Sequence, residues 1–176
     1  MLDKIIHLDI TKSTNDYALA LIASEKIKSD IAIFADIQTA GRGRLNNRSW
    51  ISIAGNLHCS YILNVADLGV ANSALALLNS ATLAAVYKLL VSVAAKQTDR
   101  IIIKQPNDIL VDHLKIAGVL IETNWPYAVI GIGINLINSP LQTSANIKTA
   151  FGKILLPIDV INPLYNHIKT AISAII

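Results

Sequence analysis

The alternation of hydrophobic and polar positions predicts a chain that mixes helices with paired strands. Ser13-Thr14-Asn15-Asp16 has the pattern of a helical capping box, and apolar residues at helical spacing continue this predicted helix to Glu25. Two more helices are predicted at 69–95 and 160–174. The predicted strands are 31–37, a hairpin of 50–54 with 57–64, 100–105, a hairpin of 109–111 with 114–122, and 127–135. Hairpins separated by helices indicate an α+β fold, with a mixed, largely antiparallel sheet and flanking helices.

The stretch from Leu68 to Tyr87 carries no charge and has a length that could cross a bilayer. Polar pairs at 72–73 and 79–80 interrupt it, seven residues apart, which is helical spacing with one weakly polar stripe. A membrane span is the alternative, but we interpret the stretch as a buried helix of a soluble domain, without membrane association.

Composition narrows the class of protein. The 176 residues fit one domain, and 53% of them are hydrophobic and 15% charged, which excludes a polar disordered chain. Cys59 is the only cysteine, so a disulfide scaffold is excluded and a reducing compartment is favoured, which predicts a cytoplasmic location. The net charge of +3 is too small to indicate nucleic acid as a partner.

Arginine is rare but clustered. Of the four arginines, Arg42, Arg44 and Arg48 fall within seven residues, in a polar loop that begins Thr39-Ala40-Gly41-Arg42-Gly43-Arg44. No helix signal follows this loop and it lacks a Gly-Lys-Ser/Thr ending, which argues against dinucleotide and P-loop motifs. Two interpretations stay open: a lid that orders over an anionic ligand, or a solvated basic loop.

Two further segments carry candidate polar chemistry. Lys104, Asn107 and Asp108 flank Pro106 at a predicted strand end, where a ligand site and an ordinary turn are both compatible with the residues. Strict alternation along 114–122 places Lys115 on the same face as the apolar residues at 117, 119 and 121. Such a lysine either extends to solvent or meets an anion.

The run Ile130-Gly131-Ile132-Gly133-Ile134-Asn135 predicts a strand with one nearly bare face. The isoleucines point into the core, and Gly131, Gly133 and Asn135 share the other face. Glycine in a strand marks close approach by a ligand or by backbone, and both interpretations remain open. A flat ring could lie on this face, with the Asn135 amide at its edge.

Other chemistries find no support in the residues. The four histidines are widely spaced and show no metal-ligand pattern, and no Ser-His-Asp elbow motif occurs. Cys59 lies in an apolar strand, so we interpret it as a core residue.

Taken together, these segments resemble the catalytic domain of biotin–protein ligases (biotin–[acetyl-CoA-carboxylase] ligases). The motifs that carry the resemblance are, in chain order, Ser13-Thr14-Asn15, Gln38-Thr39-Ala40-Gly41-Arg42-Gly43-Arg44 with Trp50, Lys104-Gln105-Pro106-Asn107-Asp108-Ile109, Lys115-Ile116-Ala117-Gly118-Val119-Leu120-Ile121-Glu122 and Gly131-Ile132-Gly133-Ile134-Asn135-Leu136. The sequence departs from the family at Gln105, where tryptophan is usual, and at Leu45-Asn46-Asn47.

The resemblance implies the biotin/lipoate ligase fold, which is like that of class II synthetases. It also implies ATP-dependent formation of biotinyl-5′-AMP and transfer of biotin to a lysine of a biotin carboxyl carrier protein or domain of acetyl-CoA carboxylase. ATP and biotin would be substrates and Mg²⁺ the metal. A homodimer is left open. A lipoate–protein ligase-like acyltransferase and a catalytically weak biotin- or carrier-binding module are the alternatives.

The resemblance also assigns roles residue by residue. The catalytic residues would be Arg44 and Lys115. The biotin-binding residues would be Ser13, Thr14, Asn15, Gln38, Gly41, Arg42, Gly43 and Gly118. The nucleotide-binding residues would be Arg48, Trp50, Lys104, Asn107, Asp108, Gly131, Gly133 and Asn135, with Asp108 also on the metal. Residues 1–176 would form the catalytic domain alone, without an N-terminal DNA-binding domain or a C-terminal SH3-like domain.

Overall fold

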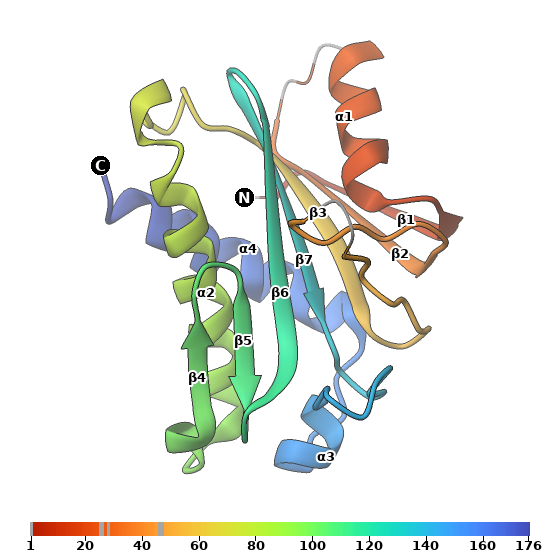
Figure 1. The fold of residues 1–176 in the computed structure, drawn as a ribbon. Helices are drawn as coiled ribbons and strands as arrows, with labels where there is room; N and C mark the ends of the chain where they lie inside the picture. The colour runs from red at the N-terminus through yellow and green to blue at the C-terminus, as the bar shows by residue number, and fades with distance from the viewer. Residues whose placement is uncertain (1, 25–26, 28, 46–47) are drawn as a thin grey trace.

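The computed structural model describes residues 2–24, 27, 29–45 and 48–176, and it contains a seven-stranded open sheet (Figure 1). The strands lie in the order β1-β2-β3-β7-β6-β5-β4. Their bounds are Lys4–Thr11 (β1), Ile31–Gln38 (β2), Leu57–Asn64 (β3), Ile101–Lys104 (β4), Asp108–Val111 (β5), Leu114–Asn124 (β6) and Tyr127–Ile134 (β7). All neighbours are antiparallel except β1 and β2, so the predicted mixed, largely antiparallel sheet is confirmed.

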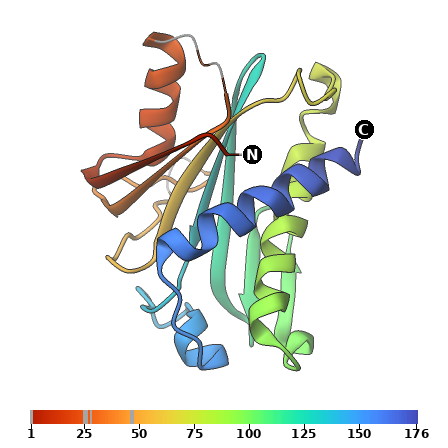
Figure 2. The same ribbon diagram turned by 180° about the vertical axis from the view of Figure 1, so that it is seen from behind.

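Helices cover the two faces of the sheet unequally. Helix α1 (Thr14–Ser24) lies on one face, over a small cluster formed by Ala18 with residues of β2, β3 and β7. Helices α2 (Leu77–Ala94) and α4 (Pro157–Ser173) pack on the other face, over the main core, as Figure 2 shows from behind. The short α3 (Ile147–Phe151) lies near one end of the sheet. The α1 face is therefore only partly covered by helix.

Several predicted elements are confirmed, and the differences have physical causes. The hairpin of 50–54 with 57–64 is wrong: β3 lies between β2 and β7, so neither of its edges is free for residues 50–54. The long helix begins at Leu77, after a 3₁₀ turn at Asn72–Ala74. Strand β1 and helix α3 were not predicted, and Glu25 lies outside the described residues.

Helix α2 is the one helix in the described part of the chain that is long and apolar enough to span a bilayer. Its mean hydropathy is 1.5 over 18 residues, and half of that window is buried inside the protein. It contacts α4 and strands β4, β5 and β6. Packing within the core thus accounts for its apolar sequence.

A buried asparagine ties the end of β7 to the segment before β3. Asn56, fully buried, accepts hydrogen bonds at Oδ1 from the backbone N–H groups of Leu136, Ile137 and Asn138, at 3.0, 3.2 and 3.1 Å. Its Nδ2 donates to the Asn138 carbonyl at 2.9 Å. One amide thus satisfies four backbone groups that the strand ladder does not pair.

Replacing Asn56→Ala should lower the free energy of unfolding by about 3 kcal/mol, since buried donors are left unsatisfied. Urea denaturation followed by circular dichroism measures the change. The exposed Asn124→Ala is the matched control, and it should stay within about 0.5 kcal/mol of the wild type. Equal stability of the two variants would contradict this role of Asn56.

Candidate functional site

A β-bulge in β6 decides where Lys115 points. Ile109 of β5 pairs with Ala117, but the next residue, Leu110, pairs with Lys115, so Ile116 is an extra residue on β6. Ile116 and Ala117 consequently both lie in the main core, whereas Lys115 Nζ approaches the face that carries Gly118. The prediction that Lys115 shares a face with residues 117, 119 and 121 is therefore wrong, because the bulge breaks the alternation.

The bare face predicted from the glycines is confirmed. Ile130, Ile132 and Ile134 are buried in the main core, on the side of α2 and α4. On the α1 side, a Cβ on Gly133 would lie 2.4 Å from Trp50 Cε2, and one on Gly118 would lie 3.2 Å from Trp50 Cζ3. The Trp50 indole therefore lies directly on this patch, in space that a side chain would otherwise fill.

The indole is held from two sides. Trp50 Nε1 donates to His58 Nδ1 at 3.0 Å, and the Lys115 ammonium lies 5.4 Å from the ring centroid, in cation–π contact. Because His58 Nδ1 accepts this bond, its ring is neutral with the proton on Nε2, which faces the Ile53 carbonyl at 3.3 Å. Burial lowers the pKa of His58, and this keeps the ring in the accepting form.

A polar group lies at the other end of the glycine strand. Gln38 Oε1 accepts from the Thr14 backbone N–H at 2.8 Å and from the Thr14 hydroxyl at 3.1 Å. Ser60 donates to Asn15 Oδ1 at 2.6 Å, and a Cβ on Gly131 would lie 2.3 Å from that same oxygen. The start of α1, the end of β2 and the middle of β3 thus bring amides and hydroxyls together beside Gly131.

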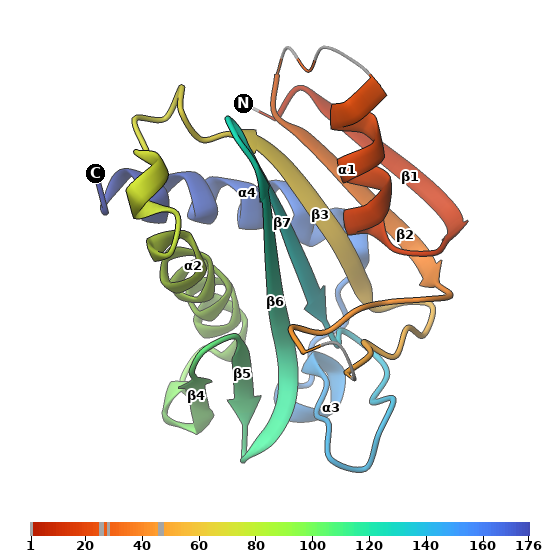
Figure 3. The ribbon, with the colours of Figure 1, turned by 45° about the horizontal axis from the view of Figure 1, so that its top comes forward.

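The arginine segment is a small hairpin that crosses the α1 face of the sheet (Figure 3). Arg42 and Ser49 form an isolated antiparallel β-bridge. Two backbone hydrogen bonds flank it, from the Gly43 N–H to the Arg48 carbonyl at 2.8 Å and from the Trp50 N–H to the Gly41 carbonyl at 2.9 Å. We call residues 41–45 and 48–50 the lid. The departure at Asn46 and Asn47 lies outside the described residues.

The guanidinium of Arg42 is paired within the protein. It makes a bidentate contact with Glu122, at 3.1 and 2.8 Å, and a third contact with Asp16 Oδ1 at 2.6 Å. The side chain of Asp16 therefore pairs with Arg42 and does not complete the predicted capping box. The other half of that box is present, because the Asp16 backbone N–H donates to Ser13 Oγ at 3.5 Å. Burial lowers the pKa of Arg42, but hydrogen bonds and charge from Glu122 and Asp16 outweigh burial and raise it.

Two adjoining cavities collect almost all of the predicted site residues. The inner cavity, about 50 Å³, is lined among others by Ser13, Thr14, Asn15, Gln38, Arg42, Gly43, Trp50, Asn107, Lys115, Gly118, Gly131 and Gly133. The outer cavity, about 370 Å³, is lined among others by Gly43, Arg44, Arg48, Trp50, Lys104, Asn107, Asp108, Lys115 and Asn135. Gly41 lines neither, and packs against Trp50 and Gln38.

Charge differs between the two cavities. The outer cavity has four cationic side chains, Arg44, Arg48, Lys104 and Lys115, against the single carboxylate of Asp108. The inner cavity is lined mainly by neutral groups, and Arg42 there is compensated by carboxylates. Lys115 lines both cavities, and its Nζ lies 2.7 Å from Asp108 Oδ1 of the outer cavity and 3.2 Å from the Cβ position of Gly118 of the inner one, which places the ammonium between the two.

Asp108 and Asn135 have protein partners. The buried Oδ1 of Asp108 accepts no well-aligned hydrogen bond, although Lys115 Nζ lies 2.7 Å away as an ion pair. Asn135 Nδ2 donates to the carbonyls of Lys115 and Ala145, at 3.3 and 3.0 Å. The Asn135 amide thus links the backbone at the bulge to the neighbouring segment at Ala145.

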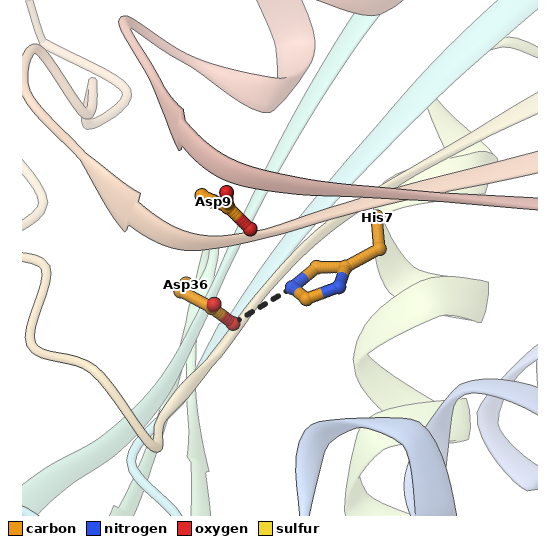
Figure 4. A group of neighbouring side chains, drawn as sticks. All are labelled: His7, Asp9 and Asp36. Atoms are coloured by element: carbon orange, nitrogen blue, oxygen red, sulfur yellow. Dashed lines mark hydrogen bonds and ion pairs between the residues drawn. The ribbon is translucent and has the colours of Figure 1, made fainter.

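A separate group of potential metal ligands lies on the opposite face of the sheet. His7, Asp9 and Asp36 are the one such group of three in the described parts of the chain, with ligand atoms within 4.8 Å of one another (Figure 4). His7 Nε2 is 2.9 Å from Asp36 Oδ1, and the His7 ring stacks on Phe34 of the main core. The group is therefore remote from the two cavities.

Sequence reasoning assigned no role to three residues of this site. Ser60 and His58 alternate with core residues of β3, and Glu122 lies two residues before the end of β6, the strand that carries Lys115. Glutamate is rare in this sequence, with Glu25 and Glu122 alone, and this rarity could have indicated a specific role for Glu122. Cys59 is fully buried, which raises the pKa of its thiol to about 12, as expected of a core residue and not of a nucleophile.

Fold and site together define a domain in which a neutral inner pocket meets a cationic outer one. Known proteins resemble this chain in sequence and in fold. The model of the Biotin/lipoate A/B protein ligase family matches residues 8–135. The biotin–[acetyl-CoA-carboxylase] ligase of Mycobacterium tuberculosis is 32% identical over 161 residues, which is 91% of this chain and 58% of that protein, so this chain spans less than two thirds of its relative.

Solved structures give the same result. Biotin protein ligase from Leishmania major matches with a TM-score of 0.81 and 29% identity in its biotin complex, covering 94% of this chain and 72% of that one. The complex of the same ligase with biotinyl-5-AMP matches with a TM-score of 0.79 and 31% identity, covering 99% of this chain and 76% of that one. The biotin protein ligase from Aquifex aeolicus, in complex with biotin and ATP, matches with a TM-score of 0.79 and 26% identity, covering 97% of this chain and 71% of that one. The chain belongs to the biotin/lipoate protein ligase family.

The buried His58 predicts a pH dependence of stability. Because burial lowers its pKa below the ordinary 6.5, the unfolded chain takes up the proton first as the pH falls. The stabilisation from the neutral ring is complete above about pH 6.5 and is lost as the pH falls towards the folded pKa. The free energy of unfolding should therefore fall less between about pH 7.5 and about pH 5 in His58→Gln than in the wild type.

Urea midpoints at the two pH values measure this difference. The exposed Asn124→Ala, which removes no titratable group, supplies the control and should keep the wild-type pH dependence. An unchanged pH dependence in His58→Gln would show that His58 does not carry the effect.

Proposed function

We propose that this domain activates biotin with ATP to biotinyl-5′-AMP and transfers the biotinyl group to a lysine of a carrier protein. The observation that carries the proposal is the position of Lys115 at the junction of a neutral pocket and a cationic one. A carboxylate from the first pocket and a phosphate from the second would meet at this ammonium. Relatives whose names specify biotin, ATP or biotinyl-5-AMP support this choice of substrates.

The first step joins two anions. A biotin carboxylate oxygen attacks the α-phosphorus, the bond between the α-phosphorus and the bridging oxygen breaks, and pyrophosphate leaves. Lys115 would offset the repulsion between the anions and stabilise the charge of the transition state. Arg44, on the lid above the outer cavity, would bind phosphate oxygens with its planar fork. The reaction needs positioned reactants and cations, and no protein nucleophile.

The inner pocket would hold the biotin ring system. Thr14, Asn15, Ser13 and Gln38 offer donors and acceptors for a ureido group. Gly118, Gly131 and Gly133 carry no side chains on this face, so a ring would fit against the sheet once the Trp50 indole and the Asn15 amide, which now occupy the space, move aside. Gly41, Arg42 and Gly43 would contribute backbone from the lid. The Trp50 indole, which lies on this patch, would cover the ligand.

The outer pocket would hold the nucleotide through Arg48, Lys104, Asn107 and the backbone near Asn135. Mg²⁺ fits the donor set there, because this ion is commonly bound by one or two carboxylates together with substrate phosphates. Asp108, the one carboxylate among the residues that line the outer cavity, is the residue that would hold it, in exchange for its present ion pair with Lys115. When bound, the ion would neutralise phosphate charge.

The second step uses the stored activation of the mixed anhydride. A carrier lysine amine attacks the biotinyl carbonyl, the carbonyl–oxygen bond to AMP breaks, AMP leaves, and the amine loses a proton. The carrier we propose is a biotin carboxyl carrier protein or domain of acetyl-CoA carboxylase, as the name of the Mycobacterium tuberculosis relative suggests. The lid would shield the anhydride from water. A cytoplasmic location and a homodimer stay predictions.

Incubation with biotin, Mg-ATP and a carboxylase carrier domain, followed by intact mass spectrometry, tests the proposal. The expected result is one biotinyl group added to the carrier, dependent on ATP. Addition of lipoyl in place of biotin would assign the domain to the lipoate branch of the family. No adenylate and no modified carrier would overturn the enzymatic proposal.

Lys115→Ala should slow biotin-dependent pyrophosphate release by about 10²–10³-fold, because one preorganised charge contact to the transition state is lost. A coupled pyrophosphate assay measures the rate. Lys153→Ala, an exposed lysine outside both cavities, is the matched control and should keep the wild-type rate. A wild-type rate in Lys115→Ala would refute the role given to this lysine.

A further inference from the structure

The group formed by His7, Asp9 and Asp36 lies at the edge of the sheet, on the face opposite the two cavities. Strand β1 stands at the end of the strand order, with β2 as its neighbour. His7 and Asp9 are two residues apart on β1, so both side chains leave the same face of the strand. The parallel register pairs His7 with Phe34, which places Asp36, two residues farther along β2, beside Asp9. The pairing of two strands thus brings together three side chains that are up to 29 positions apart in the chain.

The imidazole of His7 is held in one orientation. Its ring stacks on Phe34, with centroids 4.3 Å apart and an angle of 3° between the planes, and its Nε2 lies 2.9 Å from Asp36 Oδ1. Phe34 belongs to the main core, so the ring rests on a packed support. The imidazole and the two carboxylates point toward one another, as Figure 4 shows. A ligand group that is oriented before binding lowers the entropic cost of binding.

The group carries two carboxylates and one imidazole. Asp36 pairs with His7, whereas Asp9 makes no hydrogen bond or ion pair within the described ranges of the chain. The ligand atoms of the three residues all lie within 4.8 Å of one another, so the two anionic side chains repel each other at close range. The hydrogen bond between His7 and Asp36 does not account for the position of Asp9. A cation between the three groups would remove the repulsion and give Asp9 a partner.

The spacing fits a small metal ion. Bonds from Zn²⁺ to imidazole nitrogen and carboxylate oxygen are about 2.0–2.2 Å long, so two ligand atoms on a tetrahedral ion lie about 3.3 Å apart. His7 Nε2 and Asp36 Oδ1 are 2.9 Å apart and would have to separate only slightly. Their side chains are 48% and 44% exposed, so rotation of the side chains can bring the ligand atoms into place while the strands keep their register.

The ligand types select among divalent ions. Imidazole nitrogen suits Zn²⁺ and other late first-row metals, whereas Mg²⁺ and Ca²⁺ prefer sites made of oxygen ligands. Three protein ligands would leave a coordination position for water, as in open zinc sites.

We propose that His7, Asp9 and Asp36 bind one divalent transition-metal ion, with Zn²⁺ as the best fit, and that this ion links the edge strand β1 to β2. The site is separate from the two cavities and from the Mg²⁺ that Asp108 would hold. The inference therefore goes beyond the proposed function and does not depend on it.

Calorimetric titration of chelator-treated protein with Zn²⁺ tests the site. The expected result is one ion bound at this site, with affinity at least about tenfold lower in His7→Gln and in Asp9→Asn, because each variant loses a ligand. Asp9→Asn is the sharper variant, since no contact within the described ranges is lost with this carboxylate. Mg²⁺ at the same concentration should leave the Zn²⁺ affinity unchanged.

His113→Asn is the matched control. His113 is exposed and follows the exposed Asp112, but the two belong to no group of three potential ligands among the described residues. Asparagine suits the left-handed backbone conformation at this position. This variant should bind Zn²⁺ as the wild type does, and loss of binding here would overturn the assignment to His7, Asp9 and Asp36.

Nuclear magnetic resonance with paramagnetic Co²⁺ locates the ion independently. Amide signals of residues 7–9 and 34–37 should broaden or shift at Co²⁺ concentrations that leave the outer cavity unchanged. Equal Zn²⁺ affinity in the wild type and Asp9→Asn, no saturable binding by the wild type, displacement of Zn²⁺ by Mg²⁺, or Co²⁺ effects centred on Asp108 would each overturn the site. Because none of these measurements uses biotin or ATP, they are decided independently of the biotin-ligase proposal.

Discussion

The site depends on a patch of sheet that carries no side chains. Gly118 on β6 and Gly131 and Gly133 on β7 leave space that a Cβ would close, with neighbouring atoms as near as 2.3 Å. The tryptophan of the lid, the amides at the start of α1 and the Lys115 ammonium all approach this patch. Because α2 and α4 occupy the opposite face, a ligand would have to bind on the α1 face, where Trp50 now covers the patch.

Two features of β6 convert that space into a charged junction. The extra residue at Ile116 turns Lys115 out of the core, and the Asn135 amide holds the carbonyl of Lys115. Farther along the same strand, Glu122 forms an ion pair with Arg42, so the charge of Arg42 is compensated within the protein. One strand thus supplies the Lys115 ammonium between the two cavities and, seven residues farther on, the Glu122 carboxylate that pairs with Arg42.

The sequence was sufficient where the signal was local. The glycine–isoleucine alternation predicted the bare face, and the clustered arginines indicated a polar loop that is a candidate for ligand binding, because both patterns lie within a few residues. Pairing was not local. The bulge that reverses Lys115 depends on the register between β5 and β6, and residues 50–54 could not pair because β7 occupies the second edge of β3. The Arg42 contact joins residues 80 positions apart, so spacing could not reveal it.

The most direct test is a crystal structure of the protein with a non-hydrolysable analogue of biotinyl-5′-AMP. The account predicts the bicyclic ring over Gly131, its linkage to phosphate within hydrogen-bond distance of Lys115 Nζ, and the nucleotide in the outer cavity. An analogue bound on the face covered by α2 and α4, or one whose acyl-phosphate linkage makes no contact with Lys115, would contradict it.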